Sequence, residues 1–132
     1  MNSKIQVSFT LTGVGFDPNT VSSVIGINPT KTWRFGEQIQ NTLLKTKHDG
    51  WSISTGKQIS IDLNVQLHEI LKVIKTHIPQ IKKVIKDYKL NAEFACAIYI
   101  DGDNIPVLNF EKDVIKIICE LDAAIDIDVY LV

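Results

Sequence analysis

The chain has 132 residues, of which 45% are hydrophobic and 22% charged, and its formal net charge at pH 7 is −1. This length and composition are typical of one globular domain with its own core and exclude a disordered chain. The N-terminus alternates polar and apolar residues, unlike a signal-peptide core, and the longest apolar run, residues 94–100, is too short to cross a bilayer. We therefore expect a single domain over residues 1–132, a cytoplasmic location and no membrane partner.

The charges are unevenly distributed along the chain. Residues 1–61 and residues 62–90 each carry six basic and three acidic side chains, whereas residues 91–132 carry two basic and nine acidic ones. This asymmetry predicts separate basic and acidic regions, an arrangement suited to orienting a partner. The cysteines Cys96 and Cys119 are far apart and form no C-x-x-C motif, so we expect two reduced thiols.

The N-terminal part predicts a strand followed by a short, capped helix. Apolar and polar residues alternate over residues 5–12, as in a half-buried strand. Asp17 is placed as the N-cap of a helix, with Pro18 at its first position. Gly26 fits the left-handed residue that ends this helix, and Pro29 prevents its continuation.

The middle of the chain predicts a β-hairpin. Residues 43–47 and 51–55 flank His48-Asp49-Gly50, and an Asp-Gly pair is typical of a tight hairpin turn. We therefore expect two antiparallel strands, with Trp51 at the start of the second.

A helical pattern follows from Leu67 to Tyr88, where apolar residues are spaced by three and four. Pro79 should break or kink it, which leaves two helices in series near residues 63–77 and 79–89. The opposite face carries lysines without interleaved aromatic residues, which is typical of a solvated face. We therefore expect no nucleic-acid partner. These lysines are Lys72, Lys75, Lys82, Lys83, Lys86 and Lys89.

The C-terminal part predicts three strands and a helix. Residues 94–100 are apolar on both faces, residues 105–108 form a short strand, and a helix over 114–121 is capped by Asn109. Residues 125–131 alternate again, so the element order is β-α-β-β-α-α-β-β-α-β. This order predicts an α+β domain with a mainly antiparallel sheet and helices on one face, in an elaborated ferredoxin-like arrangement.

No motif in the sequence carries a complete catalytic or metal site. His68-Glu69 begins like a zinc-protease motif, but Lys72 stands where the second histidine would be. The DGDN stretch at 101–104 lacks the glycine and glutamate of a calcium loop, and Gly13-Val14-Gly15 lacks the third glycine of a dinucleotide loop. We expect neither a metal nor a cofactor, and the balance favours a protein that is not an enzyme.

Trp33, Arg34, Phe35 and Trp51 form the first candidate site. Trp33, Arg34 and Phe35 lie in a predicted loop and Trp51 follows the predicted hairpin turn. Tryptophan and arginine often carry the binding energy of interfaces, so this group is a candidate protein-binding surface. The alternative is that both tryptophans close the edge of the core.

The polar face of the two terminal strands forms the second candidate site, for a small-molecule ligand or an enzyme's substrate. Residues i and i+2 of a strand are about 6.5 Å apart, a separation compatible with paired-carboxylate chemistry but equally with a solvated face. A homodimer through this face and its exposed edge is a third interpretation. The residues are Ser8, Thr10, Asp126, Asp128 and Tyr130.

Three segments carry a resemblance to a known family: FTLTGVGFDPNTVSSVIGINPT, the later GW at 50–51 and the closing IDIDVYL. Together they resemble a bacterial family known as domain of unknown function 4279, over nearly the whole chain. Ile25 stands where a leucine is expected. The resemblance implies no catalytic residue, cofactor or substrate, and we interpret the chain as a non-catalytic interaction module, immunity-like or a regulatory partner of another protein. The matching residues are Phe16, Asp17, Pro18, Gly26, Ile27, Pro29, Thr30, Gly36, Trp51 and Tyr130.

Overall fold

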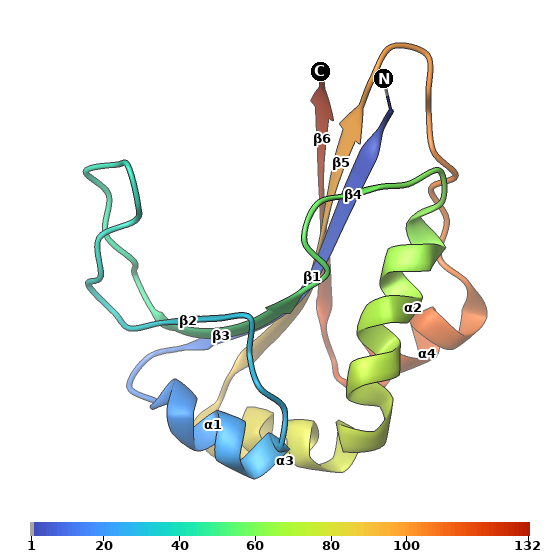
Figure 1. Cartoon of the computed structure of the whole chain (residues 1–132). Helices are drawn as coiled ribbons and strands as arrows, with labels where there is room; N and C mark the ends of the chain where they lie inside the picture. The colour runs from blue at the N-terminus through green and yellow to red at the C-terminus, as the bar shows by residue number, and fades with distance from the viewer. Residues whose placement is uncertain (1) are drawn as a thin grey trace.

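The computed structural model of the protein describes residues 2–132 and has the α+β architecture that the sequence predicts (Figure 1). Its strands are β1 (Lys4–Gly13), β2 (Lys31–Trp33), β3 (Asp49–Ser54), β4 (Gln58–Ile59), β5 (Asn91–Ile100) and β6 (Ala124–Leu131). Its helices are α1 (Pro18–Ile25), α2 (Leu63–Ile74), the short 3-10 helix η1 (Lys75–His77), α3 (Ile78–Tyr88) and α4 (Lys112–Glu120). Among the described residues, no helix has the length and apolar character needed to cross a membrane.

The sheet is mainly antiparallel, with the strand order β2-β3-β1-β5-β6 and with β4 paired to the N-terminal end of β1. Only β5 and β6 run parallel, because α4 carries the chain back across the sheet between them. The β5–α4–β6 unit is thus a direct βαβ crossover whose strands are neighbours. This detail differs from the split βαβ units of a ferredoxin-like sheet, in which another strand lies between the parallel pair.

The helices cover the convex face of a strongly curved sheet and leave the concave face open (Figure 1). Alternation along the central strands produces this arrangement. In β1 the apolar residues Val7 and Phe9 are completely buried under the helices, while Ser8 and Thr10 between them point to the concave face and are partly exposed. Phe94 of β5 packs on Phe9 with ring centroids 5.0 Å apart, so the core is continuous across the two longest strands.

The short helix α1 begins and ends at the residues that the sequence predicts. The Asp17 side chain accepts a hydrogen bond from the backbone N–H of Asn19, and Pro18 occupies the first turn. Gly26 has φ 81° and its N–H donates to the carbonyl of Ser22. A left-handed residue at this place is typical of a helix end, and glycine adopts it without strain.

The predicted division of the long helical segment at Pro79 is confirmed. α2 ends at Ile74, η1 connects it to α3, and Pro79 lies in the first turn of α3, where its missing N–H leaves no helical bond unmade. Figure 1 shows the consequence: α2 lies along one half of the curved sheet, whereas α3 lies beneath the other half beside α1.

The predicted hairpin of residues 43–47 with 51–55 is wrong. β3 pairs with β2 on one side and β1 on the other, so Trp51 lies between Thr32 and Leu11, and residues 43–47 lie outside the sheet. Asp49 and Gly50 are the first residues of β3 and make no turn. The Asp-Gly pair instead supplies a buried carboxylate, Asp49, and leaves room at Gly50 for the closely packed indole ring of Trp33.

Two smaller predictions near the C-terminus are also wrong. Residues 105–108 form no strand of the sheet, and Val107 makes only an isolated bridge with Asp62. Asn109 does not cap α4, whose N-cap is Glu111. The side chain of Asn109 instead accepts a hydrogen bond from the buried amide of Asn64 in α2, which takes it away from the helix end.

Candidate functional site

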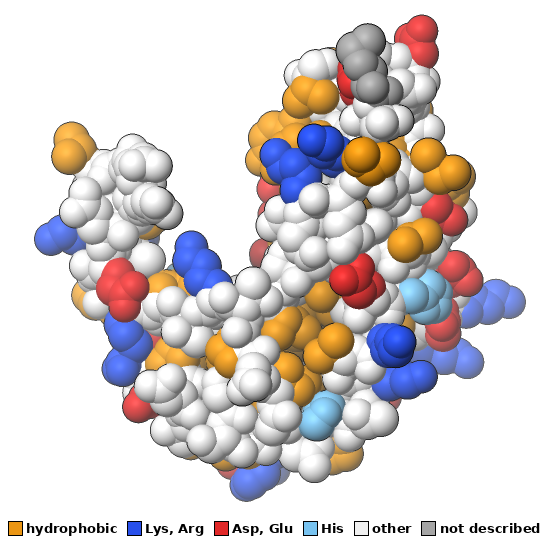
Figure 2. Space-filling model, in the orientation of Figure 1, with side chains coloured by type: hydrophobic (Ala, Val, Ile, Leu, Met, Phe, Trp, Pro, Cys, Tyr) orange, Lys and Arg blue, Asp and Glu red, His pale blue; other side chains and the backbone are white. Residues whose placement is uncertain are grey.

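Residues 34–48 leave the sheet between β2 and β3 as a projecting arm (Figure 1, left). The arm is a narrow loop held by backbone hydrogen bonds: Gly36 N–H donates to Thr46 O at 2.9 Å, and Ile39 N–H donates to Leu44 O at 2.8 Å. The Thr46 hydroxyl also donates to the carbonyl of Arg34. These bonds give the arm a defined shape. Figure 2 shows a deep hollow between the arm and the rest of the molecule.

The arm carries large apolar side chains that no core covers. Leu43 is 96% exposed, Leu44 66% and Phe35 64%. Single exposed apolar residues are common on protein surfaces, but here three project from one loop of limited length. Exposed apolar side chains on a shaped projection are typical of a surface that a partner covers.

A buried carboxylate, Asp49, fixes the root of the arm. Its Oδ1 accepts hydrogen bonds from the backbone N–H of Phe35 at 2.8 Å and from the Nε of Arg34 at 3.2 Å. Its Oδ2 accepts from the backbone N–H groups of Gly15 at 2.7 Å and Phe16 at 3.2 Å. The side chain is only 3% exposed, so four donors replace the water that the carboxylate has lost.

These donors lower the pKa of Asp49 below its ordinary value of 3.8. The largest contribution is the Phe35 N–H. Burial acts against it and raises the pKa, and the bonds from Gly15, Arg34 and Phe16 lower it further. Asp49 is therefore an ionised structural residue that joins three segments of the chain, and it is not placed as a catalytic acid.

The three residues of the predicted loop site have different environments. The Trp33 indole lies over Gly50, and its Nε1–H donates to Nδ1 of His48 at 3.2 Å. Arg34 is bound to Asp49 and lies 3.8 Å from the carboxylate of Asp17. Only Phe35 projects freely into solvent, so the structure separates an anchoring tryptophan and arginine from an exposed phenylalanine.

Trp51, the fourth residue predicted for this site, lies in the core. Its ring is completely buried under the helices, and its Nε1–H donates to the Ser22 hydroxyl of α1 at 2.9 Å. A partner has no access to it in this structure.

The concave face brings together the polar residues predicted on the terminal strands. Ser8 pairs with Ala95, which pairs with Asp126, so the serine and the aspartate lie in one row two strand spacings apart. The Thr10 hydroxyl is 2.9 Å from that of Ser52. Tyr130 stacks on Tyr99 of β5, whose ring also contacts the Lys57 ammonium.

The sequence reasoning missed Glu93, which lies on the same concave face. Burial raises the pKa of this carboxyl, and the negative charges of Asp126 and Asp128 raise it further. Glu93, Ala95 and Ala97 alternate with buried residues along β5, but the two alanines are apolar, so this partly exposed face cannot be distinguished from the buried one in the sequence. Glu93, Thr10 and the edge of Trp33 contribute to a hollow of about 580 Å³ at one end of the face.

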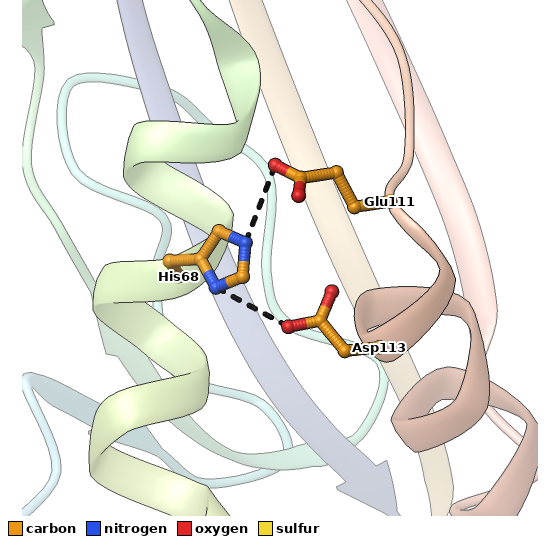
Figure 3. Close-up of side chains that lie close together, drawn as sticks. All are labelled: His68, Glu111 and Asp113. Carbon is orange, nitrogen blue, oxygen red and sulfur yellow. Dashed lines mark ion pairs between the residues drawn. The ribbon is translucent and has the colours of Figure 1, made fainter.

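A third group joins α2 to the start of α4 (Figure 3). His68 places Nε2 3.4 Å from Glu111 and Nδ1 3.7 Å from Asp113, so the two carboxylates approach opposite nitrogens of one ring. A metal ion binds a single imidazole nitrogen, and its other ligands must converge on that side. The observed contacts are those of exposed ion pairs between two helices, although one possible ligand atom from each of the three residues lies within 4.8 Å of the others.

The comparisons with known proteins agree with the sequence motifs. A family model described as domain of unknown function (DUF4279) matches residues 3–132, and the chain therefore belongs to this family. The comparison with curated proteins and the comparison with solved structures each gave no match. The family defines the domain over essentially its whole length and names no activity.

Proposed function

We propose that this protein is a non-catalytic interaction module, immunity-like or regulatory, that binds a protein partner through the arm of residues 34–48. The observation that carries the proposal is the contrast between the two ends of the arm. Its root is fixed to the sheet by Asp49, whereas Leu43 and Leu44 at its other end are exposed.

A fixed root matters energetically because binding costs conformational entropy. A loop that is already shaped by its own hydrogen bonds loses little freedom when a partner covers it. Burial of a leucine side chain contributes about 1.5–3 kcal/mol, so Leu43 and Leu44 together contribute about 3–6 kcal/mol toward offsetting the cost of association.

The charges of the arm indicate what the partner surface offers. Arg34, Lys45 and Lys47 are basic, and Glu37 is the single acidic residue between positions 34 and 48. A complementary partner presents an apolar groove for Leu43 and Leu44 with an acidic rim.

The experiment is native mass spectrometry and site-specific photo-crosslinking of the protein in its own host. A photo-reactive amino acid at Leu43 should crosslink a stoichiometric second protein, whereas the same group at the exposed Ile61, away from the arm, should not. With the purified partner, Leu43→Ser/Leu44→Ser should weaken affinity by about a hundredfold and Ile61→Ser should leave it unchanged. Equal affinity of the arm variant, at unchanged thermal stability, would overturn the proposal.

A second candidate function uses the hollow on the concave face, which Thr10, Trp33 and Glu93 help to line. Such a combination of an aromatic ring with hydroxyl and carboxyl groups suits a small polar ligand. Native mass spectrometry distinguishes the two functions, because a bound metabolite adds a small mass and a protein partner a large one. A ligand-dependent melting shift that Thr10→Ala/Glu93→Gln abolishes would support this second candidate.

A further inference from the structure

The strand β6 is a free edge of the sheet. It pairs with β5 on one side, and no other strand of the described chain, residues 2–132, pairs with it on the other side. All eight residues of β6 are exposed. An edge of this length, without proline or lysine, is a surface to which another strand can be added.

The hydrogen-bond pattern shows which backbone groups of β6 point outward. Val132 N–H donates to the carbonyl of Ile100 at 2.9 Å, in register with the pairing of Ile100 with Leu131. In a parallel pair, alternate residues bond to the neighbouring strand. The even-numbered residues therefore face β5, and the N–H and C=O groups of Ile127, Val129 and the other odd-numbered residues point away from the sheet.

The side chains of β6 present two different faces beside this edge. On the convex side lie Ile125, Ile127, Val129 and Leu131, which are between 44% and 83% exposed. On the concave side lie Asp126 and Asp128. Glu93 of the neighbouring strand β5 lies close enough for their negative charges to raise its pKa. No lysine, arginine or histidine among residues 2–132 forms an ion pair with these three carboxylates.

A second copy of the chain does not match this pattern. Two copies of β6 could pair in an antiparallel way. The apolar side chains then stay on one face only if odd-numbered residues lie opposite odd-numbered ones and even-numbered residues opposite even-numbered ones. A twofold axis at Ile127 places Asp126 opposite Asp128, and an axis at Asp128 places this residue opposite itself. Like charges directly opposite each other destabilise a sheet, so the edge disfavours its own copy in its well-overlapped registers.

We propose that β6 binds an extended segment of another protein as an additional strand, and that this segment alternates basic and apolar residues. Its backbone pairs with the outward groups of Ile127 and Val129. Its lysine or arginine side chains lie beside Asp126 and Asp128, and its apolar side chains cover Ile125 and Ile127. This surface is separate from the arm, and the proposal does not depend on the function proposed for the arm.

The test uses synthetic peptides and the full-length protein. A labelled peptide that alternates lysine and valine should bind, as measured by fluorescence anisotropy, and a peptide that alternates glutamate and valine should not. The lysine–valine peptide with N-methyl groups on every backbone amide keeps every charge but has no N–H to donate along either edge, so it should lose binding. Amide exchange of Ile127 and Val129 should slow when the unmodified peptide is bound.

Matched variants locate the charge contribution. Asp126→Asn/Asp128→Asn should lower the affinity for the lysine–valine peptide by about tenfold. Asp101→Asn/Asp103→Asn removes the same amount of charge elsewhere and should leave the affinity unchanged. Absence of binding, or equal binding of the N-methylated peptide, would overturn the proposal. The proposal would also be overturned if the protein alone formed a dimer whose affinity increased in Asp126→Asn/Asp128→Asn. The occupant of the edge would then be a second copy of the chain.

Discussion

The indole ring of Trp33 lies so close to Gly50 on the neighbouring strand that a Cβ at position 50 would come within 2.0 Å of two ring atoms. Gly50→Ala should therefore displace Trp33 and its hydrogen bond to His48. Overpacking of this kind costs about 1–3 kcal/mol, so we expect a lower free energy of unfolding and a changed tryptophan emission spectrum. Urea unfolding measures the first. Ser54→Ala at the end of the same strand is the control, and equal stability of the two variants would contradict the packing described here.

Gly50 also illustrates why part of the fold could not be predicted from the sequence. An Asp-Gly pair between two apolar segments is a strong local signal for a hairpin turn. Here the local signal is overridden, because Asp49 satisfies donors from residues 15, 16, 34 and 35, and Gly50 makes room for Trp33. Neither reason is visible without the tertiary structure.

The helix boundaries were predictable for the opposite reason. Asp17, Pro18 and Gly26 act within one or two turns of the chain, so their effect on α1 can be deduced from the sequence. The polar face of β1 and β6 was also predictable, because alternation fixes which side chains share a face. Glu93 was missed where that alternation was obscured by the alanines beside it.

Removal of the Asp49 charge should loosen the root of the arm. Asp49→Asn keeps the size of the side chain but cannot accept all four hydrogen bonds, so the free energy of unfolding should fall by about 2–3 kcal/mol at pH 7. Asp17→Asn, which retains an N-cap oxygen, should change it by less than about 0.5 kcal/mol. An equal effect of the two substitutions would show that the buried carboxylate has no special role.

The contribution of Asp49 should depend on pH in a defined direction. Its pKa is lower in the folded protein than the ordinary value of 3.8, so ionisation stabilises the folded state fully above that value. As the pH falls through the lowered pKa the contribution is lost. The difference between wild type and Asp49→Asn should therefore be constant near neutrality and shrink below about pH 4. If the difference in free energy of unfolding between the two proteins grew at acidic pH, the lowered pKa of Asp49 would be contradicted.

Glu93 should behave in the opposite way. Its pKa is raised above 4.5 by burial and by Asp126 and Asp128, so ionisation destabilises the folded state and stability falls as the pH rises past that value. Glu93→Gln should raise the free energy of unfolding at pH 7 by up to about 0.5 kcal/mol. The gain should vanish below pH 4.5, and calorimetry at the two pH values measures it. The exposed Glu120→Gln serves as the control.

The two cysteines should differ in reactivity. Cys96 is buried on the helix side of β5, and burial, assisted by the charge of Asp126, raises the pKa of its thiol to about 11. Cys119 is exposed. A maleimide should therefore modify one thiol in the folded protein and both in denaturant, and Cys119→Ser should abolish the native reaction. Rapid modification of Cys96 in the native state would contradict the burial of β5.

The His68 group should hold no metal ion. Because Glu111 and Asp113 approach opposite nitrogens of the ring, zinc should produce no melting shift at equimolar concentration. Exposed ion pairs contribute little, so His68→Gln should change the free energy of unfolding by less than about 1 kcal/mol. A zinc-dependent shift that His68→Gln removes would instead identify a metal site between α2 and α4.

The sharing of Asp49 has a consequence for local motion. The amides of Gly15, Phe16 and Phe35 belong to segments that are distant in the sequence, yet all three donate to one carboxylate. We therefore expect opening of the loop before α1 to be coupled to release of the arm, so that the three amides exchange their hydrogens at similar rates. A partner that binds Leu43 and Leu44 should therefore slow amide exchange at Gly15 and Phe16 before α1, although it does not contact these residues.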